Sequence, residues 1–103
     1  MHAAARCFDL HVPESRSLKA KRAAVRPIVE QLRHRFRVSV AEVDHHDQWQ
    51  RAAIAVAVVA ESDGRVRELL DSVERYVVAA AGTEVLDIET AWLEADDLTG
   101  SAP

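Results

Sequence analysis

The stretch from residue 38 to residue 59 constrains the fold more than any other part of the chain. It holds two runs rich in Val, Ile and Ala, separated by a short polar segment, Asp-His-His-Asp, at residues 44–47. So few residues between two strand-like runs leave room only for an antiparallel connection. The sequence therefore predicts a β-hairpin with strands over about residues 37–44 and 49–60.

The first part of the chain predicts a strand followed by a long helix. Apolar and polar residues alternate over residues 3–12, the period of a half-buried strand. Pro13 ends that strand, and Ser17 stands where a helix N-cap hydroxyl would accept a backbone N–H. From Leu18 onward apolar residues recur at three- and four-residue steps, which indicates an amphipathic helix. Pro27 lies inside this helix and predicts a kink or a division into two segments.

The second half repeats the helix-then-strand order. Ser62 can cap a helix whose apolar face runs over residues 66–77, and Gly82 is expected to close it in a left-handed conformation. Alternation over residues 83–93 predicts a fourth strand. Residues 94–103 are acidic and lack periodicity, and are expected to form a flexible tail.

The order βαββαβ is typical of the ferredoxin-like fold, a four-stranded antiparallel sheet of order 4-1-3-2 with both helices on one face. A chain of 103 residues has no room for a second core, so residues 1–93 are expected to form one α+β domain. This topology brings residues 13–17 and residues 44–48 to the same edge of the sheet. We call this edge the loop edge.

Charge is unevenly distributed along the chain. Residues 1–60 carry a net charge of +4 and residues 61–103 one of −8. Between Arg16 and Arg37 there are eight basic residues and one acid, Glu30. A polyanion such as RNA could be attracted to this segment. We call its candidate nucleic-acid-binding residues the basic ridge: Arg16, Lys19, Lys21, Arg22, Arg26 and Arg33.

Several function classes find no support in the sequence. The single cysteine, Cys7, cannot form an internal disulfide, and the longest uninterrupted apolar run, residues 52–60, is too short to span a membrane. With three glycines in all and no nucleophile or phosphate-loop motif, no catalytic residue or cofactor is predicted. The sequence thus favours a cytosolic, non-enzymatic protein.

The loop edge holds the densest group of side chains capable of chemistry. Its candidate residues are His11, Asp44, His45, His46, Asp47 and Trp49. Imidazoles and carboxylates suit zinc, and a histidine beside a carboxylate suits acid–base catalysis. Adjacent histidines on a turn point in different directions, however, and neither a helical HExxH nor a paired-cysteine motif is present. A solvated turn without a metal is therefore the favoured interpretation.

The sheet face away from the helices offers another kind of surface. Ala53, Ala55 and Ala57 are expected on this face, which makes it flat and suits a protein–protein contact such as a homodimer, or a small-ligand sensor. Binding of RNA there is disfavoured, because stacking aromatics are missing and Glu42, Asp87 and Glu89 flank the face.

Two long motifs resemble a known family. The segments HVPESRSLKAKR at residues 11–22 and RFRVSVAEVDHHDQWQRA at residues 35–52, followed by AIAVAVV, are similar to the YlxP-like family of small bacterial proteins, a domain of unknown function. The resemblance covers about residues 7–93 and implies a ferredoxin-like fold. The usual gene neighbourhood of the family, beside initiation factor two and ribosome-binding factor A, implies a role in translation or small-subunit maturation.

These observations lead to two hypotheses. The first is an accessory factor that touches ribosomal RNA or the small ribosomal subunit through the basic ridge. The second is a homodimeric interaction module, or a small-ligand sensor, that uses the uncovered sheet face.

Overall fold

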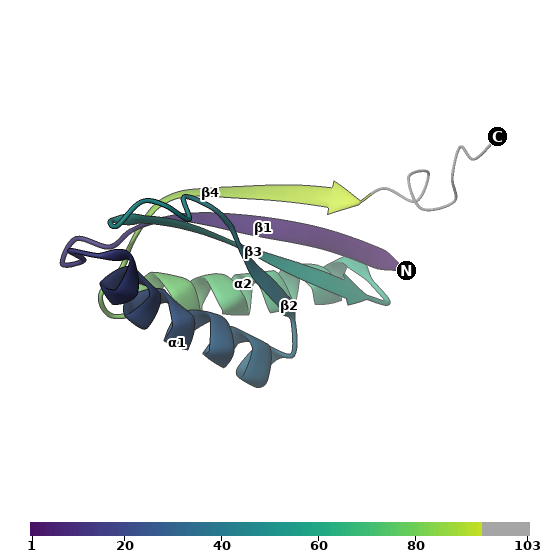
Figure 1. Cartoon of the computed structure of the whole chain (residues 1–103). Helices are drawn as coiled ribbons and strands as arrows, with labels where there is room; N and C mark the ends of the chain where they lie inside the picture. The colour runs from purple at the N-terminus through teal and green to yellow at the C-terminus, as the bar shows by residue number, and fades with distance from the viewer. Residues whose placement is uncertain (94–103) are drawn as a thin grey trace.

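The computed structural model describes residues 1–93 (Figure 1). The predicted acidic tail, residues 94–103, lies outside the described residues. None of the helices within residues 1–93 has the length and apolar character needed to cross a membrane. The elements in chain order are β1 (His2–His11), α1 (Leu18–Phe36), β2 (Ser39–Asp44), β3 (Arg51–Ala60), α2 (Asp63–Ala79) and β4 (Glu84–Leu93).

The four strands form one antiparallel sheet in the order β2-β3-β1-β4. Both helices lie on the same face of this sheet, and no other element of residues 1–93 covers the opposite face (Figure 1). The predicted ferredoxin-like fold and its strand order are confirmed.

The core lies between the sheet and the two helices. The side chains of Phe8, Leu10, Ile54 and Val56 are fully buried there, and each comes from the inward-facing set of a central strand. Leu32 of α1 and four residues of α2, Val66, Leu70, Val73 and Val77, close the core from the helix side. The alternation in the sequence correctly predicted which side chains of β1 and β3 point toward the helices, because successive side chains of a strand point to opposite faces of the sheet.

The hairpin forms as predicted, with shorter strands. β2 begins at Ser39 because Arg37, the C-cap of α1, adopts a left-handed conformation with φ of 55° that no strand can include. β3 begins at Arg51, and the pairing of β2 with β3 shifts register between Glu42 and Asp44. Residues 45–50 therefore form the connection.

Helix α1 is one continuous element despite Pro27. Ser17 caps it, since its hydroxyl accepts the Ala20 N–H at 3.0 Å. Of the two predicted consequences of Pro27, a kink or a division into two segments, the division is wrong. Pro27 is exposed, while Val25 and Ile28 on either side of it are buried against the sheet, so packing holds the helix together across the missing hydrogen bond.

Helix α2 is capped by Ser62, whose hydroxyl accepts the Arg65 N–H at 3.2 Å. The helix ends at Ala79, earlier than predicted, with Ala80 as its C-cap. Gly82 has the expected positive φ, 84°, but it lies in the turn that leads into β4 and does not cap the helix.

Candidate functional site

The two loops predicted to form the loop edge are neighbours. The Val12 N–H donates to the Gln50 carbonyl at 2.9 Å, and the Gln50 side-chain amide donates to the carbonyls of Pro13 at 3.4 Å and Ser15 at 3.2 Å. These bonds join the end of β1 to the start of β3, as the topology predicted.

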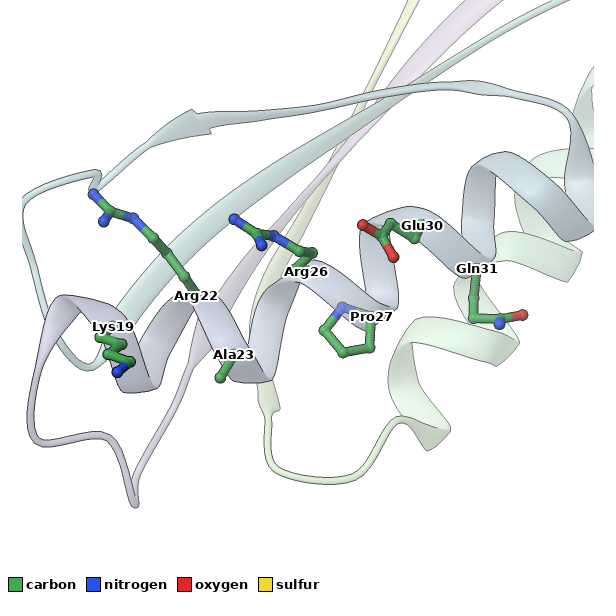
Figure 2. Close-up of a pocket in the computed structure, with 7 residues that line it drawn as sticks. All are labelled: Lys19, Arg22, Ala23, Arg26, Pro27, Glu30 and Gln31. Carbon is green, nitrogen blue, oxygen red and sulfur yellow. The ribbon is translucent and has the colours of Figure 1, made fainter.

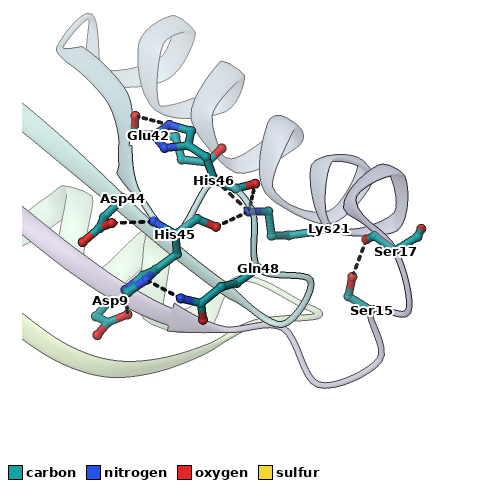
Figure 3. A network of polar contacts seen from close by, with 9 residues as sticks. All are labelled: Asp9, Ser15, Ser17, Lys21, Glu42, Asp44, His45, His46 and Gln48. Carbon is teal, nitrogen blue, oxygen red and sulfur yellow. Dashed lines mark hydrogen bonds and ion pairs between the residues drawn. The ribbon is translucent and has the colours of Figure 1, made fainter.

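Lys21 holds the hairpin connection against α1 (Figure 3). Its ammonium group donates to the carbonyls of His45 at 2.8 Å and His46 at 3.3 Å, and it lies 3.2 Å from a carboxylate oxygen of Glu42. The side chain is 1% exposed. Lys21 is therefore an internal support, and its predicted place on an exposed basic ridge is wrong.

The physical reason can be read from the spacing of buried positions in α1. Lys21, Val25, Ile28 and Leu32 are the buried residues of the helix, and their steps of four, three and four residues place them on one stripe. Lys21 thus extends the apolar stripe by one turn. Its ammonium reaches the backbone of the loop, where carbonyls satisfy its donors.

His45 lies at the centre of the polar contacts beyond Lys21. The Asp44 side chain accepts its backbone N–H at 2.7 Å, and its φ of 62° is left-handed. Its ring nitrogen Nε2 lies 3.6 Å from an Asp9 carboxylate oxygen, while Arg51 donates to the other oxygen of that carboxylate at 2.6 Å. The Gln48 amide contacts His45 Nδ1 at 3.2 Å. Arg51 and His45 thus contact the two carboxylate oxygens of Asp9. Figure 3 shows His45 between Asp9, Asp44 and Gln48.

The other loop-edge candidates do not converge on this histidine. His11 pairs with Glu84 of β4 at 3.3 Å, and the ring of His46 contacts the Glu42 carbonyl at 3.2 Å. Asp47 and Trp49 are exposed, the latter by 55%. Within residues 1–93 no group of three or more His, Cys, Asp or Glu side chains is arranged to hold a metal ion.

Cys7 lies beside Asp9 on the sheet face away from the helices. With Ala53, Asp87 and Glu89 it lines a shallow depression of about 310 Å³. Burial raises the pKa of the Cys7 thiol, and the negative charges of Asp9, Glu89, Asp44 and Asp87 raise it further. The thiolate, which is the nucleophile, is therefore disfavoured at neutral pH. This arrangement gives no support to a thiol-based catalytic site.

The exposed basic surface is formed by Lys19, Arg22 and Arg26 of α1. Figure 2 shows Arg22 and Arg26 along one side of the helix with Glu30 next along that side, and Lys19 lower in the view, in line with Ala23 and Pro27. The three cations line a depression of about 530 Å³ together with Ala23, Pro27, Glu30 and Gln31. Within residues 1–93 none of the three cations has a carboxylate within 4.0 Å.

A second depression, of about 320 Å³, lies between α1 and Glu42 of β2. Arg22 and Arg26 line both depressions, so anionic groups can approach them from two sides. Arg33 lines the second one, but its guanidinium donates to the Val40 carbonyl at 2.7 Å and ties α1 to β2. Arg16, the remaining residue of the predicted ridge, is exposed in the loop before the helix.

Comparison with known proteins places the chain in context. A family model described as "Protein of unknown function (DUF503)" matches residues 4–90. The uncharacterized protein YlxP of Bacillus subtilis (strain 168) is 30% identical over 76 residues, which are 74% of this chain and 83% of that protein. A crystal structure of a dimeric ferredoxin-like protein from an uncultured marine organism is 10% identical. It covers 93% of this chain and 91% of its own, with a TM-score of 0.42.

Proposed function

The chain belongs to the DUF503 family of proteins of unknown function, and we propose that it is a cytosolic, non-enzymatic accessory factor that binds RNA through α1. One observation carries the proposal. Lys19, Arg22 and Arg26 form an exposed row of cations with no carboxylate within 4.0 Å among residues 1–93, and three cations outnumber the one acid, Glu30, that lines the first depression with them. The chain as a whole has a net charge of −4, so this row is a local exception that suits phosphate groups.

The geometry of α1 favours an extended anion. Arg22 and Arg26 are one turn apart, about 6 Å along the helix axis, and both border two depressions. These depressions are open and follow the helix, which suits an extended anion with phosphates spaced along it. Ribosomal RNA or the small ribosomal subunit is the narrower part of the proposal, and its support is the translation-linked gene neighbourhood implied by the family resemblance.

The experiment measures binding of a labelled single-stranded RNA and of purified small ribosomal subunits at two salt concentrations. Three phosphate contacts predict a slope of about −2 for log affinity against log salt, which is about a 20-fold loss between 50 and 200 mM. The variant Arg22→Glu/Arg26→Glu should lose most of the affinity and of the salt dependence.

The control is Arg65→Glu/Arg75→Glu, which changes net charge equally from exposed positions of α2. It should retain binding to within a few-fold, because α2 lacks the row of unpaired cations. Equal losses in the two double variants would mean that only net charge matters. Undiminished binding by Arg22→Glu/Arg26→Glu would remove α1 from the interface.

The sheet face away from the helices favours a second candidate, a homodimeric interaction module or a small-ligand sensor. The observation behind it is that Val59 is 68% exposed and Leu93 43% exposed, although both belong to the sheet. An uncovered apolar sheet face is usually a contact surface.

A further inference from the structure

Charges of both signs line the second depression, the one between α1 and β2. Its charged residues are three arginines and two acids: Arg22, Arg26, Arg33, Glu30 and Glu42. Figure 2 shows Arg22, Arg26 and Glu30 on the same side of α1, and Glu42 borders the depression from β2. A lining that offers hydrogen-bond acceptors as well as donors suits a ligand that carries both kinds of group, which a bare phosphate does not.

Glu42 brings a carboxylate with spare acceptor capacity to this depression. Its oxygen Oε1 is buried and lies 3.2 Å from the Lys21 ammonium, an ion pair without hydrogen-bond geometry. The side chain is 24% exposed, and because Oε1 is buried this exposure lies on its other atoms. Within residues 1–93 no hydrogen bond reaches the second oxygen, Oε2. Since partly buried polar groups normally find hydrogen-bond partners, Glu42 is suited to a ligand that donates to it.

The remaining groups of the lining suit the base and the phosphate of one nucleotide. Val25 is buried and Val29 is partly buried, so they provide an apolar surface for the face of a base. Guanidinium groups bind phosphates and also stack on bases. Arg22 and Arg26 line both depressions, so a nucleotide with its phosphate on them can place its base in the second one. The volume of this depression, about 320 Å³, lies at the lower end for small-molecule sites.

The chemistry of a carboxylate determines which bases suit Glu42. An ionised carboxylate accepts hydrogen bonds and cannot donate, so it suits the exocyclic amino group of cytosine, adenine or guanine. Uracil has no amino group, and a carbonyl oxygen stands on each side of its ring N–H, where both would face the carboxylate unfavourably. Glu42 should therefore distinguish cytosine from uracil, two bases of nearly equal size.

We propose that the depression between α1 and β2 binds one base of a single-stranded RNA, and that Glu42 selects a base with an exocyclic amino group. The inference rests on the proposed RNA binding by α1 and specifies the kind of RNA. A single strand is required because duplex RNA keeps the amino groups of cytosine and adenine in a deep, narrow groove that side chains do not read. The exposed cations hold phosphates, and Glu42 reads a base.

The test compares the affinity of the unmodified chain for oligo-C and oligo-U RNA of equal length, about ten nucleotides, by fluorescence anisotropy. Oligo-C should bind about tenfold more tightly, the effect of one hydrogen bond to a charged group. Both oligonucleotides carry the same number of phosphates, so the two affinities should fall equally with salt and their ratio should persist. An oligo-C with two methyl groups on each exocyclic nitrogen lacks the donors and should bind like oligo-U.

Glu42→Gln should reduce the ratio of the two affinities to within about twofold, because an amide can accept from cytosine or donate to uracil. The ratio is measured within one variant, so a general loss of stability through Lys21 does not change it. The matched control is Glu14→Gln, which removes the same charge from an exposed position in the loop before α1, outside the depression. This control should keep the preference of the unmodified chain.

Two outcomes would overturn the inference alone. One is equal affinity of the unmodified chain for oligo-C, its methylated form and oligo-U, while Arg22→Glu/Arg26→Glu still abolishes binding. The other is a preference for oligo-C that Glu42→Gln retains, which would mean that the base is read elsewhere. If the unmodified chain binds none of these oligonucleotides, the proposed function fails and the inference fails with it.

Discussion

Lys21 shows how one side chain can support a whole loop. A buried ammonium is unfavourable unless its hydrogen bonds are satisfied and its charge is balanced. Two backbone carbonyls and the Glu42 carboxylate meet both needs here. Among the hydrogen bonds within residues 1–93, those of Lys21 are the only ones that join α1 to the loop at residues 45–50, so the position of this loop relative to the helix depends on this lysine.

We predict that Lys21→Met destabilises the folded chain by about 2–4 kcal/mol, because the partly buried carbonyls of His45 and His46 lose a charged donor and Glu42 loses its counter-ion. Lys19→Met is the control, since Lys19 is exposed on the same helix and should change stability by less than about 0.5 kcal/mol. Urea denaturation followed by circular dichroism measures both midpoints. Similar midpoints for the two variants would contradict the supporting role.

Residue identity alone did not reveal this role. Lysine is rarely buried, so its type predicted an exposed cation, while its place in the 21-25-28-32 spacing indicated the buried stripe. The spacing was the better signal. The same limit applies to His45, because its contact with Asp9 joins residues 36 positions apart in the sequence and depends on a left-handed turn that local pattern does not specify.

At the scale of elements, α1 continues through Pro27, although a proline in a helix interior usually breaks or kinks the helix. The Pro27 ring removes one backbone hydrogen bond, and its position disfavours helical geometry at Arg26. The buried residues on both sides of it belong to one core, so breaking the helix would cost more than the missing bond.

We therefore predict that Pro27→Ala stabilises the chain by about 1–3 kcal/mol, because alanine restores the backbone donor and suits a helix interior. Gln31→Ala, one turn later and also exposed, should change stability by less than about 0.5 kcal/mol. The urea midpoint should rise for the first variant with an unchanged slope. A lower midpoint for Pro27→Ala would show that the proline fits a geometry that alanine does not stabilise.

Elements and topology were predictable because their signals are local and repeated. Alternation identified the strands, the three- and four-residue steps identified the helices, and Ser17 and Ser62 capped them as their positions indicated. The ends of elements were less predictable: Arg37 shortened β2 by adopting a left-handed conformation, a property of the tertiary turn more than of arginine. The sequence predicted which segments are rich in basic or acidic residues. It did not predict which of those side chains are exposed.

At the scale of the whole molecule, the two candidate surfaces lie on opposite faces of the sheet. The exposed cations Lys19, Arg22 and Arg26 lie on a helix that covers one face, and Asp9, Asp87 and Glu89 lie on the other. The helices and these acids thus lie on opposite sides of the sheet (Figure 1). A homodimer through the sheet face away from the helices, the second candidate function, would leave the exposed cations of both copies on its outer surfaces.

This separation predicts that the two candidate functions, RNA binding and homodimerisation, are independent. Val59→Glu should leave the affinity of each chain for a short RNA in solution unchanged to within about twofold, because distant sites that share no contacts behave additively. Arg22→Glu/Arg26→Glu should likewise leave the sedimentation behaviour of the chain unchanged.

Binding free energies are reciprocal, so any effect of RNA on dimerisation must equal the effect of dimerisation on RNA affinity. Fluorescence anisotropy with a short labelled RNA at protein concentrations below and above the dimerisation range measures this coupling. A change in affinity of more than about fivefold across that range would show that the sheet connects the two faces energetically, and that they do not act as separate surfaces.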